Sequence, residues 1–366
     1  MNYSTLASVL GREINDLSNM VLGTKAPENV IWFLTERCNL ECSHCFVSHK
    51  GRVYRSELEA QEIKRVLTTG GGIFKRVTFT GGEPLLYKDF GDVFLFASNL
   101  QGMRHVHVST NGLYHEKLFD ILKKCQNKNV KYQIQSSIDG PEQIHNMVRG
   151  NNKAFGGLMT LIEKFRVFSS QSDLQCDMNL IMTLSRRNKK YLTETLGLAK
   201  EFKIPLTLNF VRSSHDAKLP ASDTSDFAPA TDEGLSINEI KALTDEWCQY
   251  AKKHLGIFMY SLNKTKMENT IYFYETGNWK FPCAAGRDDA VILSDGSVAI
   301  CEMKKPVGNL REFDFDYLKF WEKYHDNSMH TCYCTYDCAM LYSINKSVRG
   351  HATILKEMLI PLKKAA

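Results

Sequence analysis

The chain has 366 residues, of which 43% are hydrophobic and 24% are charged, and its formal net charge is +5. This composition is ordinary for a globular protein, and the length suffices for one large domain and a smaller one. No apolar run approaches the ~20 residues of a membrane span. Residues 1–28 lack the basic head and apolar core of a secretion signal, and like charges form no long block. We therefore expect a cytoplasmic protein without membrane partners, and nucleic-acid binding is not indicated.

Strand-like and helix-like segments alternate from residue 30 to about residue 211. Apolar segments typical of buried strands lie at residues 30–34, 76–80, 106–109, 132–137, 178–182 and 206–211. Helical patterns separate them, and the first has a capping box at Ser56 and Glu59 and ends at Gly70. This alternation predicts a parallel sheet with right-handed crossovers, either open or partly closed into a barrel. Ligands are expected at the carboxyl ends of its strands.

The alternation stops after residue 212. Residues 213–234 are rich in Ser, Asp, Ala and Pro and predict a long loop, and a capping box at Ser236 and Glu239 predicts the start of another helix. We divide the chain into an N-terminal extension (1–28), an α/β region (29–212), a loop and bridging helical region (213–280), a second cysteine-containing domain (281–345) and a helical tail (346–366).

Three of the eleven cysteines follow the first strand, as Cys38-x3-Cys42-x2-Cys45. In a reducing compartment, clustered cysteines bind metal more often than they form disulfides. Three thiolates on one loop can hold three corners of a [4Fe–4S] cluster and leave the fourth iron open, as a catalytic centre needs. The alternative is a zinc site with His44 or His49 as the fourth ligand.

Glycine and polar residues follow the next three strands. Gly81-Gly82-Glu83 comes after the second strand, where glycines would let a ligand approach the backbone and a carboxylate could hold an ammonium group. The ends of the next strands and the segments after them supply the polar residues Ser109, Asn111, Ser137, Asp139 and Arg149. Each motif alone is typical of an ordinary turn. Together they predict a ring of polar groups above one pole of the sheet.

With these motifs in order, the chain resembles the radical S-adenosylmethionine (SAM) superfamily over residues 30 to about 211. The resemblance implies an α/β fold, a partial (β/α)6 TIM-like barrel, with a [4Fe–4S] cluster on Cys38, Cys42 and Cys45 and SAM chelating its open iron. It matches Gly81, Gly82 and Glu83 to the motif that contacts the methionine amino group, Ser109 and Asn111 to positions near the ribose and methionine, Ser137, Asp139 and Arg149 to polar positions around the cofactor, and His44 to the position beside the adenine.

A second group of cysteines lies near the C-terminus: Cys283, Cys301, Cys332, Cys334 and Cys338. Residues 293–301 predict a hairpin with Asp295-Gly296 as its turn. This region resembles the SPASM/twitch extension of radical SAM enzymes, which implies a small C-terminal α+β iron–sulfur domain. Because no cysteine follows Cys338, five thiols suffice for one auxiliary [4Fe–4S] cluster and not for two. We expect Cys283, Cys301 and Cys338 as ligands, with Cys332 or Cys334 as the fourth, and structural zinc is the alternative.

The resemblance implies that an external one-electron reductant, of the flavodoxin or ferredoxin type, drives SAM to a 5′-deoxyadenosyl radical that abstracts a substrate hydrogen atom. The leading hypothesis is modification of a peptide by crosslinking, oxidation or epimerisation, although 1–28 is short for a peptide-recognition domain. A small-molecule dehydrogenase or epimerase, for example one acting on an amino sugar, is the alternative. A non-catalytic iron–sulfur or zinc scaffold is the third, and the SAM-site motif speaks against it.

Four further residues are weak candidates for a role in catalysis. Cys176 and Cys248 are candidate hydrogen-atom donors, and Asn209 and Arg212 are candidate substrate ligands because they lie near the carboxyl end of the last strand.

Overall fold

The computed structural model describes residues 26–47, 54–212, 233–324 and 332–363. Most of the predicted N-terminal extension, most of the predicted loop 213–234, and His49 lie outside the described residues.

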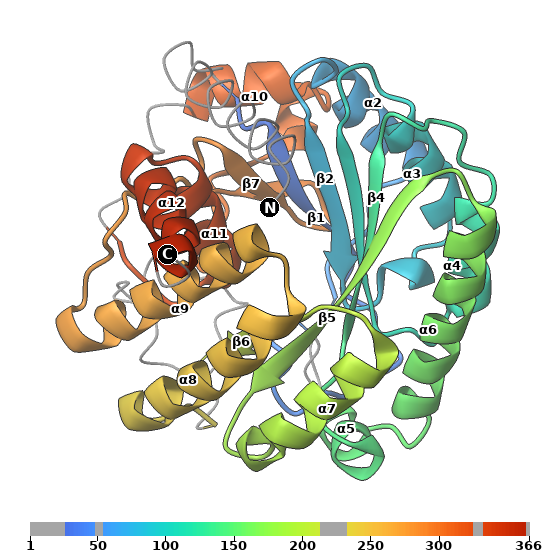
Figure 1. The fold of residues 1–366 in the computed structure, drawn as a ribbon. Coiled ribbons are helices and arrows are strands. Elements are labelled where there is room, and N and C mark those ends of the chain that lie inside the picture. The colour runs from blue at the N-terminus through green and yellow to red at the C-terminus, as the bar shows by residue number, and fades with distance from the viewer. Residues whose placement is uncertain (1–25, 48–53, 213–232, 325–331, 364–366) are drawn as a thin grey trace.

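Six parallel strands form the centre of the molecule (Figure 1). They are β1 (Asn29–Thr35), β2 (Arg76–Gly81), β3 (His105–Thr110), β4 (Lys131–Ser137), β5 (Gln175–Leu184) and β6 (Leu206–Phe210). Neighbours in the sequence are neighbours in the sheet, in the order β6-β5-β4-β3-β2-β1. This confirms the predicted α/β partial barrel. It also confirms all six predicted strands.

Helices between the strands cover the convex side of the sheet (Figure 1). They are α2 (Ala60–Thr69), α3 (Phe90–Ser98), α4 (His115–Leu122), α5 (Glu142–Arg149), α6 (Ala154–Gln171) and α7 (Leu192–Phe202), with short 3-10 turns at Pro84–Leu86 and Lys189–Tyr191. Helix α2 begins later than predicted. Its N-cap is Glu59, and the partner in the capping box is Glu62, whose side chain accepts a hydrogen bond from the Glu59 amide.

The C-terminal region extends the same sheet beyond β1. Strand β7 (Asp289–Ile292) pairs in parallel with β1, and β8 (Ser297–Ala299) and β9 (Gly308–Asn309) follow in antiparallel order. The hairpin predicted around Asp295-Gly296 joins β7 to β8, and its turn requires the glycine, since φ of Gly296 is +86°. The sheet is therefore continuous across the predicted boundary at residue 281.

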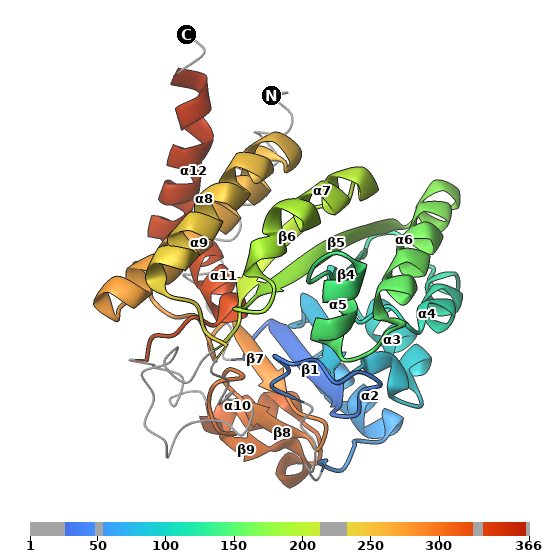
Figure 2. The same ribbon diagram turned by 90° about the horizontal axis from the view of Figure 1, so that it is seen from below.

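Five further helices and one 3-10 turn lie in the described part of the chain after residue 233. They are α8 (Ile237–His254), α9 (Ile257–Thr276), the 3-10 turn Leu310–Phe313, α10 (Tyr317–Tyr324), α11 (Asp337–Asn345) and α12 (Val348–Lys363). Helix α9 contacts α8, α11 and α12, so these four form one flank of the molecule (Figure 2). The predicted capping box of α8, Ser236 with Glu239, is confirmed.

The two sides of the sheet differ in character. All seven residues of β1 are buried, which explains its unbroken apolar sequence. In β4, buried and partly exposed residues alternate, and buried Tyr132 packs on Phe94 of α3. The partly exposed residues of β4 therefore point to the concave side of the sheet. No helix among the described residues has the length and apolar content to cross a bilayer.

Candidate functional site

The three cysteines of the N-terminal group lie on the loop that leaves the carboxyl end of β1. The backbone amide of Cys45 donates to the carbonyl of Cys42 at 3.1 Å, and the amide of Leu40 donates to Cys38 Sγ at 3.4 Å. All three side chains are partly exposed and none forms a disulfide. The loop therefore presents three thiols together at the predicted pole.

The end of β2 holds this cysteine loop through backbone contacts. The amide of Gly82 donates to the carbonyl of Thr35 at 2.8 Å, and the amide of Glu83 donates to the carbonyl of Arg37 at 2.8 Å. A Cβ atom at Gly81 would lie 2.1 Å from the Thr35 oxygen, and one at Gly82 would lie 2.2 Å from the Arg37 oxygen. The two glycines are thus required for packing against the cysteine loop, whereas the sequence interpretation had them admit a ligand.

Glu83 connects β2 to the end of β3. Its Oε1 accepts hydrogen bonds from the Leu85 amide (3.2 Å) and the Thr110 hydroxyl (2.9 Å), and its Oε2 accepts one from the Asn111 amide (2.8 Å). The side chain is fully buried, and this burial raises the pKa of Glu83 to about 7. The three hydrogen-bond donors oppose this rise. Oε2 keeps one further acceptor position, so the expected ammonium contact is limited to that oxygen.

Asn111 joins the end of β3 to the cysteine loop. Its Nδ2 donates to Asn39 Oδ1 at 2.7 Å and lies 3.9 Å from Cys38 Sγ, while its Oδ1 accepts from the Leu113 amide. Ser109 lies on the concave side, where its Oγ accepts a long hydrogen bond from Gln135 Nε2 at 3.5 Å. The structure therefore brings Asn111 to the cysteines and places Ser109 deeper in the sheet.

The end of α5 holds the middle of the cysteine loop. Arg149 Nη1 lies 3.6 Å from Cys42 Sγ, and Arg149 Nη2 pairs with Asp139 Oδ2 at 2.6 Å. Burial alone would raise the pKa of Asp139, but the Arg149 guanidinium holds it below its usual value. Burial raises the pKa of Cys42, and the same guanidinium opposes this rise. Arg149 thus supplies a fixed positive charge beside Cys42.

The backbone of the same helix end completes this contact. The amide of Glu41 donates to the carbonyl of Arg149, and the amide of Ser43 donates to the carbonyl of Val148 at 2.9 Å. Gly150 ends α5 with φ of +63°, and a Cβ there would lie 2.5 Å from the Glu41 oxygen. His44 lies beside this contact with a buried Nδ1 that has no hydrogen-bond partner among the described residues, and burial lowers the pKa of its ring. Ser137 ends β4 next to Ile181 of β5.

Four of the five C-terminal cysteines interact electrostatically with one another. After burial, the largest effects that raise the pKa of Cys334 are the charges of Cys301, Cys283 and Cys332. Burial raises the pKa of Cys301 to about 12, and Cys283 and Cys332 add to this rise.

Cys338 has different neighbours. Burial is the largest cause of its raised pKa, and the strongest charges that act on it are those of Glu302 and Arg212. These electrostatic contacts link Cys334, Cys301, Cys283 and Cys332, and the selection of four ligands from the five thiols, with Cys283, Cys301 and Cys338 expected, stays a prediction.

Arg212 lies between the two cysteine groups. It forms an ion pair with Glu302, the residue after Cys301, and its guanidinium stacks on the rings of Phe46 (4.0 Å) and Tyr336 (4.8 Å). Asn209 Oδ1 accepts a hydrogen bond from the buried Lys266 at 3.2 Å. These two candidate substrate ligands are thus engaged within the protein.

The two candidate hydrogen-atom donors lie away from the site. Cys176 lies opposite Tyr132 in the β4–β5 register, near the amino ends of these strands. The cysteine loop lies at the other pole of the sheet. Cys248 lies on α8, where its electrostatic neighbours are Lys264, Asp245 and other charged residues of the helical flank.

The concave side carries amide side chains that the sequence analysis did not single out. Gln133 Nε2 of β4 donates to Asn179 Oδ1 of β5 at 2.9 Å, and Gln135 reaches Ser109 of β3. In the sequence, the two glutamines alternate with Tyr132 and Ile134. This alternation could have shown that the glutamines face the side of the sheet opposite to the helices.

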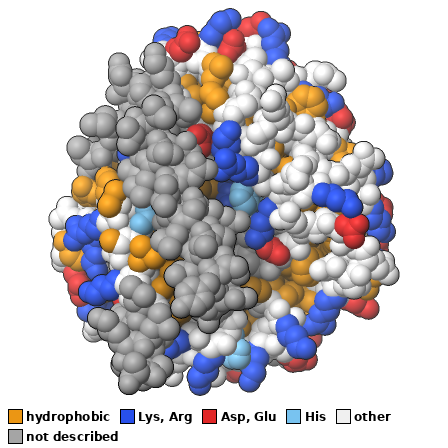
Figure 3. Space-filling model, turned by 45° about the horizontal axis from the view of Figure 1, so that its top comes forward, with side chains coloured by type: hydrophobic (Ala, Val, Ile, Leu, Met, Phe, Trp, Pro, Cys, Tyr) orange, Lys and Arg blue, Asp and Glu red, His pale blue; other side chains and the backbone are white. Residues whose placement is uncertain are grey.

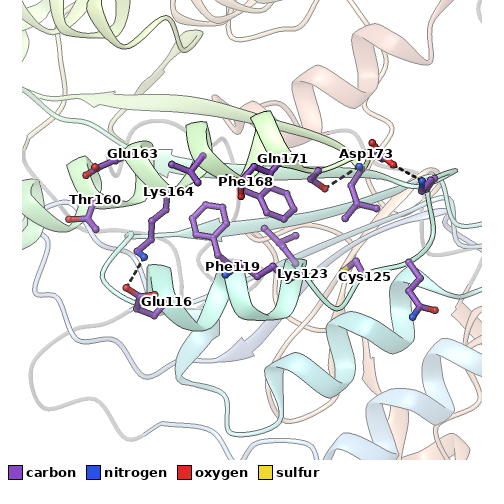
Figure 4. Close-up of a pocket in the computed structure, with 16 residues that line it drawn as sticks. Glu116, Phe119, Lys123, Cys125, Thr160, Glu163, Lys164, Phe168, Gln171 and Asp173 are labelled. Atoms are coloured by element: carbon purple, nitrogen blue, oxygen red, sulfur yellow. Dashed lines mark hydrogen bonds and ion pairs between the residues drawn. The ribbon is translucent and has the colours of Figure 1, made fainter.

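Surface features elsewhere do not add to this site. A groove of about 1020 Å³ lies between α4 and α6 on the outside, with the Lys164–Glu116 ion pair at its rim (Figure 4). On the face shown in Figure 3, acidic and basic side chains are interspersed.

The N-terminal cysteine loop has the donor set of a [4Fe–4S] cluster: three partly exposed thiols of one loop with a cation beside them. Within the described ranges, no three His, Cys, Asp or Glu side chains converge closely enough to share one metal ion. A cubane binds each thiolate through a different iron, so its ligands stand further apart than those of a single ion.

Comparison with known proteins agrees with this site. Residues 32–169 match the model of the Radical SAM superfamily. The chain is 29% identical over 177 residues to the Fe-coproporphyrin III synthase of Methanosarcina barkeri (48% of this chain, 42% of that protein). It is 30% identical over 167 residues to the sporulation killing factor maturation protein SkfB of Bacillus subtilis (44% and 37%). The chain thus spans less than half the length of these two relatives.

The crystal structure of Streptococcus suis SuiB bound to the precursor peptide SuiA has a similar fold. The TM-score is 0.58 at 18% identity, over 87% of this chain and 69% of that chain. The same enzyme bound to S-adenosylmethionine gives 0.59 at 16% identity. The parallel sheet with its C-terminal antiparallel extension is therefore a known architecture. Residues 32–169, which contain the cysteine loop, thus match the radical SAM superfamily of enzymes.

We predict that Gly82→Ala disrupts the cysteine loop. The new Cβ would lie 2.2 Å from the Arg37 backbone oxygen, so the loop must shift, and the reconstituted protein should lose most of the iron held by Cys38, Cys42 and Cys45. Gly156→Ala in α6 is the matched control, because its Cβ meets no atom within 4 Å. It should keep its iron and gain roughly 0.5–1 kcal/mol in free energy of unfolding. Equal iron content in both variants would contradict the packing role of Gly82.

We also predict a pH-dependent stability difference between the iron-free wild type and Glu83→Gln. The pKa of Glu83 rises from its usual 4.5 to about 7 on folding, so the folded chain retains a proton that the unfolded chain releases. The wild type should therefore lose about 3 kcal/mol relative to the variant as pH rises from about 4.5 to 7, with a constant difference above pH 8. Urea unfolding at several pH values measures this. A difference that is flat from pH 4.5 to 8 would show that the carboxyl is not destabilised by burial.

Proposed function

We propose that this protein binds a [4Fe–4S] cluster on Cys38, Cys42 and Cys45 and uses it to cleave SAM reductively. The observation that carries this proposal is the fixation of the cysteine loop by β2, β3 and α5 together, through Gly82, Asn111 and Arg149. When bound and reduced, the cluster supplies the electron that splits SAM into methionine and the 5′-deoxyadenosyl radical. The family match over residues 32–169 supports this chemistry.

Polar groups of the chain would hold SAM at the same pole. The remaining acceptor position of Glu83 Oε2 suits an ammonium group. Within the part of the chain that the structure describes, Nδ1 of His44 and Oγ of Ser43 are buried beside the cysteines with no hydrogen-bond partner, and each can pair with a polar atom of the nucleoside. Ser109, Ser137 and Asp139 would border the cofactor from β3, β4 and the segment after β4. Gly81 would act through packing.

The concave side of the sheet is the proposed substrate surface. Gln133, Gln135 and Asn179 present amide groups there, and amides can pair with both the N–H and the C=O of a peptide backbone. SkfB is named as a maturation protein and SuiB was solved with a precursor peptide, which supports a peptide substrate here too. Crosslinking, oxidation or epimerisation of a peptide is therefore the leading reaction class.

A small-molecule substrate is the second candidate. The similarity to Fe-coproporphyrin III synthase favours it, because that name denotes a tetrapyrrole product. The two candidate functions can be distinguished by adding each kind of substrate to the enzyme. If the substrate is a peptide, adding it should raise the rate of 5′-deoxyadenosine release, and the mass of the peptide should change. If the substrate is a small molecule, a tetrapyrrole should have these two effects instead.

The C-terminal cysteines are proposed to hold one auxiliary [4Fe–4S] cluster. Four of the five thiols Cys283, Cys301, Cys332, Cys334 and Cys338 would be its ligands, with Cys338 lying beside Arg212 and Glu302. When bound, this cluster would accept an electron from the substrate radical or relay electrons from an external reductant of the flavodoxin or ferredoxin type.

Reduced, reconstituted protein should convert SAM to 5′-deoxyadenosine and methionine, measured by chromatography. Cys42→Ala should lower this rate by at least about 100-fold, since it removes one of three cluster ligands. Cys248→Ala on α8 is the matched control and should keep the wild-type rate. If Cys42→Ala released as much 5′-deoxyadenosine as the wild type, the proposed function would be wrong.

A further inference from the structure

Residues 54–59, which lead into helix α2, lie between the start of the cysteine loop and the turn of the β7–β8 hairpin. The amide of Leu58 donates to the carbonyl of Ser294 in that turn at 2.7 Å, and its carbonyl accepts from the Tyr87 hydroxyl at 2.8 Å. The Leu58 side chain is buried, and a Cβ atom at Gly296 would lie 3.2 Å from it. The segment 54–59 is therefore fixed to the hairpin by its backbone and by packing.

Arg55 contacts one carboxylate on each side of this segment. Its Nη1 pairs with Glu36 Oε1, its amide donates to Glu36 Oε2 at 3.4 Å, and its Nε lies 3.7 Å from Asp295 Oδ2. Glu36 is two residues before Cys38, and its side chain is 0% exposed. Asp295 is in the turn of the hairpin, where its Oδ1 accepts from the Ser297 amide at 2.9 Å. One guanidinium thus joins the start of the cysteine loop to the C-terminal hairpin.

Glu57 holds the residues on either side of Glu36. Its Oε1 accepts hydrogen bonds from the Thr35 hydroxyl and from Arg37 Nε (2.9 Å), and its Oε2 accepts one from Arg37 Nη2 (2.8 Å). The Arg37 amide donates to the same Thr35 hydroxyl at 3.0 Å. The segment 54–59 therefore contacts three consecutive side chains directly before the first cysteine.

Of these contacts, the one between Arg55 and Glu36 has the greater effect on the loop. A buried carboxylate is stable only when it is paired with a cation and hydrogen-bonded. The pair of Arg37 with Glu57 is more accessible, since the Arg37 side chain is 50% exposed, and pairs of that kind contribute little. The place of Glu36, and with it the backbone that leads to Cys38, therefore depends on the place of Arg55.

We propose that Arg55 is a positioning residue, which holds the cysteine loop in its SAM-binding arrangement by joining Glu36 to the hairpin at Asp295. This inference rests on the proposed function, because it concerns the affinity of that site for SAM. Arg55 acts through Glu36 and not on the bound cofactor. Without Arg55, the loop would adopt the arrangement in which the thiols and Glu83 meet SAM for a smaller fraction of the time. The apparent affinity for SAM would fall by that fraction.

The first test is the kinetics of Arg55→Met, measured as 5′-deoxyadenosine release at varied SAM concentration with a chemical reductant. The KM for SAM should rise about tenfold and kcat should fall less than about threefold, because saturating SAM itself selects the competent loop. Arg65→Met is the matched control. Arg65 of α2 also pairs with a C-terminal carboxylate, Asp314, but both side chains are more than half exposed. This variant should keep both constants within about twofold of the wild type.

Two milder variants keep the proposal falsifiable if Arg55→Met folds poorly. Asp295→Asn keeps the Oδ1 acceptor of the turn and removes the charge that faces Arg55. Arg55→Lys keeps a cation for Glu36 but has no second nitrogen for Asp295. Each should raise the KM for SAM about threefold, and the double variant should equal the single ones, because both changes break the same contact. An increase of about ninefold in the double variant would show independent effects and would overturn the proposal.

Hydrogen–deuterium exchange on the iron-free chain tests the same contact without any SAM chemistry. The amides of residues 37–45 should exchange faster in Arg55→Met and Asp295→Asn than in the wild type, and at the wild-type rate in Arg65→Met. Unchanged exchange in Arg55→Met would overturn the inference. A lower kcat with an unchanged KM would also overturn it, because only the amount of folded enzyme would then have changed. A wild type that releases no 5′-deoxyadenosine would instead overturn the proposed function, and the exchange rates would still report the contact.

Discussion

The contact between the end of β2 and the cysteine loop is the constraint on which the rest of the site depends. Two backbone hydrogen bonds, from the Gly82 amide to the Thr35 carbonyl and from the Glu83 amide to the Arg37 carbonyl, hold the loop against the end of the sheet. A side chain at either glycine would collide with a backbone oxygen. Because backbone atoms form this contact, it fixes the loop before any cofactor binds. The side chains of Asn111 and Arg149 can then reach individual thiols.

The strands could be predicted from the sequence because burial in a parallel sheet determines the residue types of each strand locally. Strands such as β1, buried along their whole length, must be apolar throughout. Helix α5 was missed for the opposite reason, since its buried residues include His145 and Arg149, which break an apolar stripe. The C-x3-C-x2-C spacing identified the first cysteine group. Which C-terminal thiols act electrostatically on one another depends on contacts that no local pattern encodes.

The two cysteine groups are joined by buried charges. Arg212 reaches Phe46 beside the first group and Glu302 and Tyr336 beside the second. Lys266 of α9 pairs with Asp337 at 3.0 Å and also donates to the carbonyl of Leu208. The three partners of Arg212 lie 90 to 166 residues away in the sequence, so only the position of Arg212 at the end of a strand suggested a role, as a substrate ligand. Breaking such buried pairs is costly, which makes the separation of the two groups a fixed property of the fold.

The central claim is that the open iron of the N-terminal cluster binds SAM. The most direct measurement is pulsed electron paramagnetic resonance on the reduced Cys301→Ala variant, in which the auxiliary signal should be lost, with SAM labelled with nitrogen-15 at its amino group. The account predicts a hyperfine coupling between that nitrogen and the cluster of Cys38, Cys42 and Cys45. A reduced cluster whose spectrum is the same with and without labelled SAM would contradict it.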